Sequence, residues 1–192
     1  MLKKGERGDG MDKLAVLRQY FGFPAFRAGQ QTLIDAVLSG RDALGVMPTG
    51  GGKSLCYELP ALLLPGMTLV VSPLISLMKD QVMALRNAGI PAGCINSSMS
   101  LDELRETYRD ARYGAYKLLY VAPERLLTDG FCSLAQELEI PLVAVDEAHC
   151  ISQWGQDFRP SYLKIVEFLE RLPRRPAVAA FTATATAQVR AD

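Results

Sequence analysis

The chain has 192 residues, about the size of one ordinary domain, and 49% of them are hydrophobic, which excludes a disordered protein. Lysine and arginine number 21, as do aspartate and glutamate, so the net charge of zero does not indicate a nucleic-acid binder. No apolar run reaches the roughly 18–20 residues of a membrane helix, and one histidine with four separated cysteines gives no zinc-site spacing.

The first residues of the chain are polar. Residues 1–10 lack the apolar stretch of a secretory signal peptide and are predicted to be a polar tail. Residues 11–192 are predicted to form one domain. Within it, residues 11–40 are expected to be a helical preface that FGFPAFRAGQ, residues 21–30, interrupts.

Beyond this preface, short apolar runs alternate with helix-length segments. The predicted strands are Ala43–Met47, Thr68–Val71, Gly93–Ile95, Leu118–Val121, Leu142–Val145 and Val178–Thr182. Helices are predicted from the glycine-rich loop through Leu59, over Ile75–Ala88, over Ser100–Arg112 with a capping box, and from near Ser161. The alternation predicts an α/β fold, a mostly parallel sheet with helices on both faces and ligands at the carboxyl ends of its strands.

A glycine-rich segment, PTGGGKS, follows the first predicted strand and precedes a helix. The residues expected to bind the phosphates of ATP are Thr49, Gly50, Gly51, Gly52, Lys53 and Ser54. Lys53 would reach the β- and γ-phosphates, and Ser54 would offer its hydroxyl to Mg²⁺. Met47 stands where the strict phosphate-loop pattern has glycine. The alternative is a flexible glycine turn followed by an exposed lysine.

Two adjacent carboxylates, Asp146 and Glu147, follow the strand Leu142–Val145. Asp146 is placed to hold Mg²⁺, and Glu147 is placed to orient and deprotonate an attacking water. With Lys53 they are the predicted catalytic residues. The letters DEAH alone could be a solvated acidic loop, but the phosphate loop lies upstream in the expected order.

These motifs resemble the RecQ family of ATP-dependent DNA helicases, over residues 17 to about 190. The most specific segment is AHCISQWGQDFRPSY at residues 148–162, and FGFPAFRAGQ resembles the family's adenine-recognition motif. VVSPLISLMKDQV (residues 70–82), YVAPERL (residues 120–126) and FTATAT (residues 181–186) resemble three further motifs. The resemblance implies a RecA-like P-loop NTPase domain, the first motor domain of a protein that moves on single-stranded DNA and unwinds duplexes.

The resemblance also implies a second motor domain, a zinc module and a winged helix, all outside this chain. We therefore expect the chain to bind ATP and Mg²⁺ but no zinc, and neither to unwind DNA nor to hydrolyse ATP usefully by itself. Its expected partners are single-stranded DNA and duplex junctions, with no membrane. As a fragment it is expected to be monomeric and cytoplasmic, and nucleoid-associated in a bacterium.

By the same resemblance, Phe23, Arg27 and Gln30 recognise the adenine of ATP. Phe23 would stack on the base, and a glutamine can pair with adenine N6 and N7. The alternative makes the phenylalanines core residues and Gln30 a helix cap. Both can hold if Phe21 and Phe26 are core and Phe23 stacks.

A larger set of residues is expected to contact DNA or to couple the DNA to the nucleotide. It comprises Ser72, Lys79, Arg125, His149, Trp154, Gln156, Phe158, Arg159, Thr182 and Thr184. A free Trp154 ring could stack on a base, worth ~1–3 kcal/mol, although it could instead pack against the last helix. Gln156 and Ser161 depart from the residues most frequent in the family, His and Glu.

Two other functions remain open on the sequence. An RNA-directed motor of the same superfamily would share the phosphate loop and the acid pair, but Gln30 within FRAGQ and the segment AHCISQWG favour the DNA motor. A non-catalytic nucleotide-binding module is disfavoured because Lys53, Ser54, Asp146 and Glu147 are all present.

Overall fold

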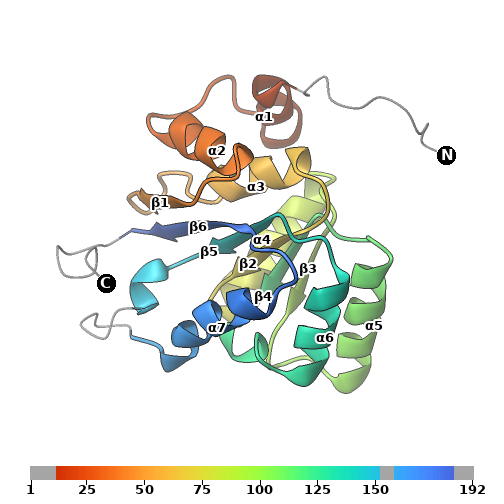
Figure 1. Ribbon diagram of the computed structural model, residues 1–192. Helices are drawn as coiled ribbons and strands as arrows, with labels where there is room; N and C mark the ends of the chain where they lie inside the picture. The colour runs from red at the N-terminus through yellow and green to blue at the C-terminus, as the bar shows by residue number, and fades with distance from the viewer. Residues whose placement is uncertain (1–11, 152–157, 184–192) are drawn as a thin grey trace.

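The computed structural model describes residues 12–151 and 158–183, which form a parallel sheet between two layers of helices (Figure 1). The strands are β1 (Ala43–Val46), β2 (Thr68–Val71), β3 (Ala92–Ile95), β4 (Leu118–Val121), β5 (Leu142–Val145) and β6 (Ala177–Thr182). The helices are α1 (Lys13–Phe21), α2 (Gln30–Leu38), α3 (Leu55–Leu63), α4 (Ile75–Asn87), α5 (Leu101–Arg112), α6 (Asp129–Glu137) and α7 (Lys164–Arg171), with 3₁₀ turns η1 (Pro123–Arg125), η2 (Ala148–Ile151) and η3 (Pro160–Leu163).

The six strands lie in the order β1-β6-β5-β2-β4-β3, and every pairing is parallel. All four residues of β2, β4 and β5 are buried, as expected for central strands that helices cover on both faces. Because the strands run in one direction, their carboxyl ends share one edge of the sheet. The segments after β1, β2, β4, β5 and β6 therefore converge there.

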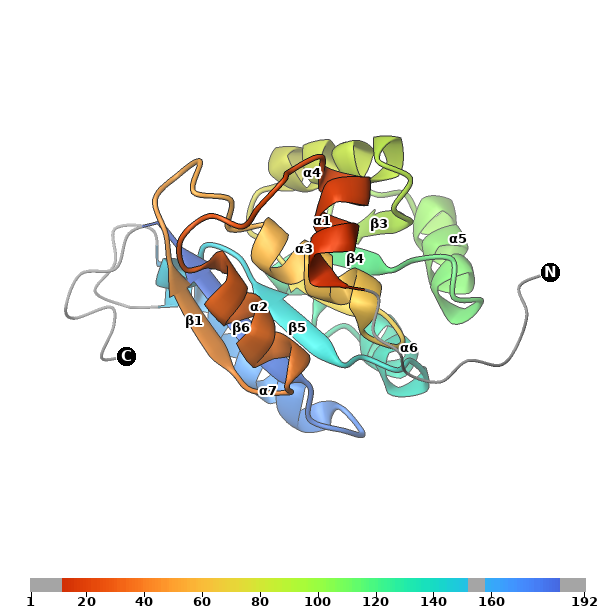
Figure 2. The same ribbon diagram turned by 90° about the horizontal axis from the view of Figure 1, so that it is seen from above.

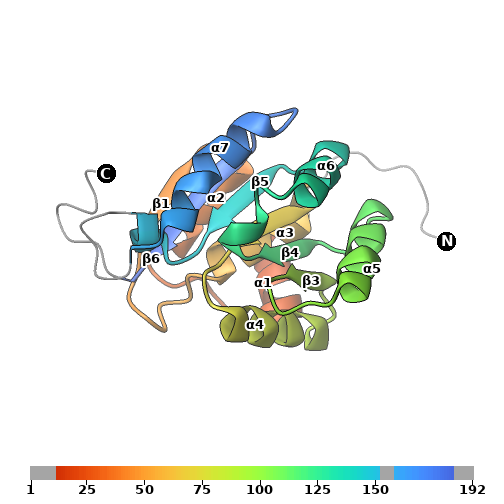
Figure 3. The same ribbon diagram turned by 90° about the horizontal axis from the view of Figure 1, so that it is seen from below.

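Each face of the sheet has its own hydrophobic core. On one face α2, α3 and α4 contribute residues such as Val37, Tyr57 and Met78, and α1 packs outside them (Figure 2). The Tyr57 ring packs on Phe181 of β6 with their centroids 5.5 Å apart. The other face is covered by α5, α6 and α7 (Figure 3). There Phe131 of α6 packs against Phe168 of α7, alongside residues of α5. The helices therefore cover both faces, as the sequence predicts.

The predicted elements match the structure closely. Strands β2, β4 and β5 have the predicted bounds, and the other three differ by one residue at one end. Ser100 caps α5 in the predicted capping box, with its hydroxyl accepting from the Glu103 amide. Helix α6 was not predicted. In the described ranges, no helix combines the length and the apolar character that crossing a membrane requires.

Candidate active site

The phosphate loop connects β1 to α3 and is held from behind by the helical preface. Gly50 and Gly52 have φ angles of 76° and 78°, in the left-handed region that favours glycine. Arg27 Nη1 donates to the Gly50 carbonyl (2.6 Å), and Gln30 Nε2 donates to the Gly52 carbonyl (3.1 Å). A side chain at residue 52 would place its Cβ 2.5 Å from Gln30 Nε2, so the close approach also requires glycine.

A cavity of about 340 Å³ lies between the preface and the phosphate loop. Its lining residues are Phe23, Ala25, Arg27, Gln30, Gly50, Gly52, Lys53, Ser54 and Leu55. The structure thus brings the predicted adenine residues and four of the six predicted phosphate residues to one cavity of the size range typical of small-molecule sites, whereas Thr49 and Gly51 do not line it. Phe23 is 46% exposed, whereas Phe21 and Phe26 pack against core residues, the division that the sequence predicts.

The acid pair follows β5, as predicted. Asp146 is buried, its backbone carbonyl accepts the Tyr162 hydroxyl (2.8 Å), and its Oδ1 accepts the Glu147 amide (3.0 Å). Glu147 has a φ of 49°, an uncommon backbone conformation for a residue other than glycine. Such conformations are characteristic of functional sites, where the surrounding structure enforces them.

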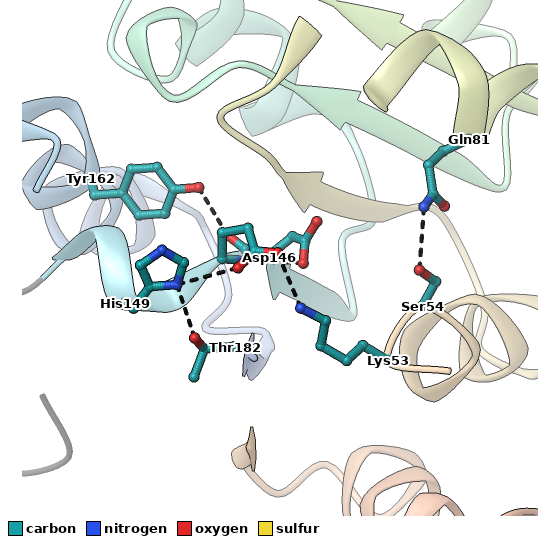
Figure 4. A network of polar contacts seen from close by, with 8 residues as sticks. Lys53, Ser54, Gln81, Asp146, His149, Tyr162 and Thr182 are labelled. Carbon is teal, nitrogen blue, oxygen red and sulfur yellow. Dashed lines mark hydrogen bonds and ion pairs between the residues drawn. The ribbon is translucent and has the colours of Figure 1, made fainter. Parts of the chain in front are cut away.

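The Glu147 side chain contacts one residue of the phosphate loop and one of η2, and Figure 4 labels both partners, Lys53 and His149. Its Oε1 lies 3.1 Å from Lys53 Nζ of the phosphate loop, and its Oε2 lies 3.2 Å from His149 Nδ1 of η2. The same His149 nitrogen lies 2.9 Å from Thr182 Oγ1 at the end of β6. A continuous set of polar contacts therefore runs from the phosphate loop through the acid pair to the segment FTATAT.

Burial raises the pKa of the Asp146 carboxyl above its usual range, and the neighbouring Glu147 charge raises it further, while Lys53 opposes both effects. A bound cation would favour the ionised carboxylate. Ser54 and Asp146 offer hydroxyl and carboxylate oxygens, the ligand type that Mg²⁺ prefers. Mg²⁺ commonly takes one or two protein ligands and completes its shell with phosphate oxygens and water, so this donor set fits a Mg²⁺-nucleotide complex.

The residues expected to contact DNA lie on the same edge where the structure describes them. Ser72 follows β2 and is buried, Arg125 ends η1 after β4, and Lys79 is exposed on α4. Arg159 is exposed, and its Nη1 donates to the Pro73 carbonyl (3.2 Å). Within the described part of the chain, Ser72 Oγ and Arg125 Nε are buried without a hydrogen-bond partner.

Of the remaining members of the predicted set, the structure describes Phe158 alone. Phe158 is half-buried at the start of the second described range. Trp154, Gln156 and Thr184 lie outside the described residues, so the predictions about them stay predictions.

Sequence reasoning missed two side chains that border the site. Tyr162, whose hydroxyl donates to the Asp146 backbone carbonyl, is the last residue of the segment AHCISQWGQDFRPSY, and no role was predicted for it. Gln81 of α4 donates from Nε2 to Ser54 Oγ at 3.4 Å (Figure 4). A glutamine on a helix gives no signal of a contact with a residue 27 positions earlier.

Comparison with known proteins gives concordant matches. Residues 27–191 match the DEAD/DEAH box helicase family. The chain is 52% identical over 179 residues to the ATP-dependent DNA helicase RecQ of Bacillus subtilis, and 50% identical over 172 residues to that of Haemophilus influenzae. These alignments cover 93% and 90% of this chain but 30% and 28% of the relatives, so the chain spans less than a third of their length.

Solved structures of helicases share the fold. A hypothetical ATP-dependent RNA helicase from Sulfolobus tokodaii superimposes with a TM-score of 0.71 at 22% identity, over 93% of this chain and 52% of that one. The DUF1998 helicase MrfA superimposes with a TM-score of 0.74 at 18% identity, over 95% of this chain and 31% of that one. At these identities the likeness concerns the fold, and it confirms the predicted RecA-like α/β architecture.

Proposed function

The chain belongs to the DEAD/DEAH box helicase family, and from that premise we propose that it is the ATP-binding motor domain of a RecQ-like DNA helicase. The observation that carries the proposal is the contact between Lys53 and Glu147, beside a cavity that the preface and the phosphate loop line together. This contact brings together the lysine that we assign to phosphate binding and the carboxylate that we assign to activating water.

We assign the following roles to the residues of the site. The amides of the phosphate loop and Lys53 bind the phosphates of ATP, while Ser54 and Asp146 hold Mg²⁺. Glu147 orients the attacking water and accepts its proton. Bound Mg²⁺ would neutralise charge on the phosphate oxygens. Gln30 supports the loop through Gly52, and we propose that it also selects adenine, with Phe23 stacking on the base and Arg27 beside it.

Single-stranded DNA is the proposed partner, bound along the carboxyl edge of the sheet by Ser72, Lys79, Arg125 and Arg159. The buried polar atoms of Ser72 and Arg125 support a ligand there, because such atoms cost free energy until a partner satisfies them. The contacts of His149 with Glu147 and Thr182 support a route by which DNA binding reaches the catalytic carboxylate. The relatives' names favour DNA over RNA.

Unwinding is a proposal for the longer protein, because this chain spans less than a third of the length of the two RecQ relatives reported above. We propose that the longer protein acts at duplex junctions, on the chromosome, and thus at the nucleoid in a bacterium. For the chain itself we propose a monomer that binds ATP and turns it over slowly.

Calorimetry with a non-hydrolysable ATP analogue and Mg²⁺ tests the proposal directly. We expect binding by the wild type and a loss of more than about tenfold in Lys53→Ala, since each 1.4 kcal/mol of lost phosphate interaction costs tenfold. Lys164→Ala, which changes an exposed lysine of α7, is the matched control. Equal affinities in wild type and Lys53→Ala would contradict the assignment of the phosphate site.

DNA preference needs a separate measurement on the longer protein. Fluorescence anisotropy should show tighter binding to a single-stranded DNA than to an RNA of the same sequence. The reverse order would favour the RNA-directed alternative.

A further inference from the structure

A cluster of polar side chains adjoins the phosphate loop at Ser54. Gln81 of α4 donates from Nε2 to Ser54 Oγ at 3.4 Å, and its Oε1 lies 3.3 Å from the Tyr120 hydroxyl of β4. That hydroxyl also lies 3.3 Å from Glu58 Oε1 of α3. The buried Tyr57 phenol interacts with Ser54 and Tyr120. The proposed Mg²⁺ ligand is therefore the outermost member of a hydrogen-bonded cluster drawn from three elements.

The donors and acceptors of this cluster allow two arrangements. Tyr120 has one proton for two acceptors at the same distance, so it can donate to Gln81 or to Glu58 but not to both. When Tyr120 donates to Glu58, the Gln81 amide can turn over and donate to the Tyr120 oxygen instead. Its carbonyl oxygen then faces Ser54, whose hydroxyl becomes the donor.

The two arrangements differ in what Ser54 offers to a cation. In the first, an N–H group of Gln81 points at Ser54 Oγ and occupies one of its lone pairs. In the second, the Ser54 proton points at Gln81, and the lone pair that the Gln81 N–H group occupied is free. The hydroxyl also becomes more negative at oxygen because hydrogen bonds in a chain polarise one another. A cation therefore favours the second arrangement.

The structure leaves room for this turn. A cavity of about 410 Å³ adjoins the cluster, and its lining includes Ser54, Glu58 and Gln81. Gln81 is half-buried, so its amide is not locked by close packing on all sides.

We propose that Gln81 is a positioning residue of the nucleotide site, whose amide turns to accept the Ser54 proton and so directs Ser54 Oγ toward Mg²⁺. The proposal rests on the proposed function, since it acts on the residue assigned to Mg²⁺. Gln81 lies on α4, the helix that also carries Lys79. This helix begins just after Pro73, whose carbonyl accepts a hydrogen bond from Arg159. A displacement of α4 by bound DNA would move the Gln81 amide relative to Ser54.

The test compares nucleotide affinity with and without the metal. Calorimetry with a non-hydrolysable ATP analogue is performed on the 192-residue chain in Mg²⁺ and in EDTA. For Gln81→Leu, the affinity in Mg²⁺ should fall roughly two- to tenfold, the range of one net hydrogen bond, while the affinity in EDTA stays at the wild-type value. Met83→Ala, at a residue 60% exposed on the same helix, should change neither value.

A second pair of variants separates positioning from polarity. Gln81→Glu keeps an acceptor and has no N–H to present to Ser54, so its affinity in Mg²⁺ should equal or exceed that of the wild type. Gln81→Asn keeps the amide but is too short to reach Ser54, so its affinity in Mg²⁺ should fall as in Gln81→Leu. If the leucine variant does not fold, the asparagine variant tests the positioning role in its place.

Three results would overturn the positioning role. They are a wild-type affinity of Gln81→Leu in Mg²⁺, an equal loss of its affinity in Mg²⁺ and in EDTA, or a Gln81→Glu variant as weak as Gln81→Leu. These differ from a failure of the proposed function, in which the wild type itself would bind no nucleotide in either condition.

Discussion

Lys53 Nζ lies 3.1 Å from Glu147 Oε1, so an ion pair joins the phosphate loop to the acid pair across 94 positions of the sequence. Both side chains are largely shielded from solvent, at 13% and 24% exposure. Phosphate oxygens must compete with Glu147 for the same ammonium group. Nucleotide binding would therefore release the Glu147 carboxylate from Lys53 at the moment when it is needed to hold a water.

This competition predicts the effect of Glu147→Gln. Removing the charge should raise the affinity for the ATP analogue by up to about fivefold, because a partly exposed ion pair is worth about 1 kcal/mol or less. Any ATP turnover by the protein should be lost, because the amide cannot accept a proton from water. Calorimetry and a phosphate-release assay measure the two effects. Glu170→Gln, at an exposed residue of α7, controls for the loss of one charge, and a lower affinity in Glu147→Gln alone would contradict the competition.

Gly52→Ala should disrupt the phosphate loop. The new Cβ would lie 2.5 Å from Gln30 Nε2, and the φ of 78° is unfavourable for alanine. We expect the free energy of unfolding to fall by about 1–3 kcal/mol and nucleotide affinity to fall by more than about tenfold. Gly40→Ala is a matched control because Gly40 also has a positive φ, but its Cβ would meet no atom within 4 Å. Equal nucleotide binding by the two variants would show that the approach of Gln30 is unimportant.

Gln30→Ala separates adenine recognition from support of the loop. The Gln30 amide accepts from the Arg27 backbone (2.8 Å) and donates to Gly52 (3.1 Å), so both of its ends are engaged within the protein. We expect the wild type to prefer ATP over GTP and Gln30→Ala to lose affinity for ATP more than for GTP. Competition binding measures the ratio, with Gln31→Ala at an exposed neighbouring residue as the control. An equal loss for both nucleotides would leave Gln30 with the supporting role alone.

Stability should depend on pH through Glu58. Burial raises the pKa of this carboxyl from 4.5 to about 7, and the Asp146 charge adds to the effect, while the Tyr120 hydrogen bond opposes it. The folded protein thus holds the proton more tightly than the unfolded chain. The resulting stabilisation is full below the unfolded pKa near 4.5 and is lost as the pH rises through about 7.

Urea unfolding in EDTA at several pH values measures this effect. The free energy of unfolding should fall by roughly 1–3 kcal/mol across that interval. Asp146 contributes with the same sign, because its pKa is also raised. The difference between the wild type and Glu58→Gln therefore isolates Glu58. Parallel profiles for the two proteins would mean that Glu58 titrates normally.

Much of this fold was readable from the sequence because central parallel strands are apolar on both faces. The runs at β2, β4 and β5 stand out for that reason, and the motifs follow directly after strands. Helix α6 was missed although Phe131, Leu134 and Ala135 are spaced for a buried face. The segment is short and contains Gly130, so its helix depends on packing against α5 and α7 more than on local preference.

The candidate site was readable only in part. The phosphate loop and the acid pair each occupy contiguous residues, so a local pattern reveals them. The contact of His149 with Thr182 and the contact of Gln81 with Ser54 join distant segments, and only the order of the strands brings them together. No spacing in the sequence encodes such contacts.

The strand order also has a consequence for synthesis. Among the described strands β1 pairs with β6 alone, so Ala43 lies opposite Ala179. The ribosome releases β1 first of the six strands and β6 last. The neighbours β2, β4 and β3 can pair earlier, whereas the strand that carries the phosphate loop has no partner until the segment through Thr182 has emerged. A nascent chain stalled before residue 177 would contain the whole of PTGGGKS and still be unable to hold a nucleotide.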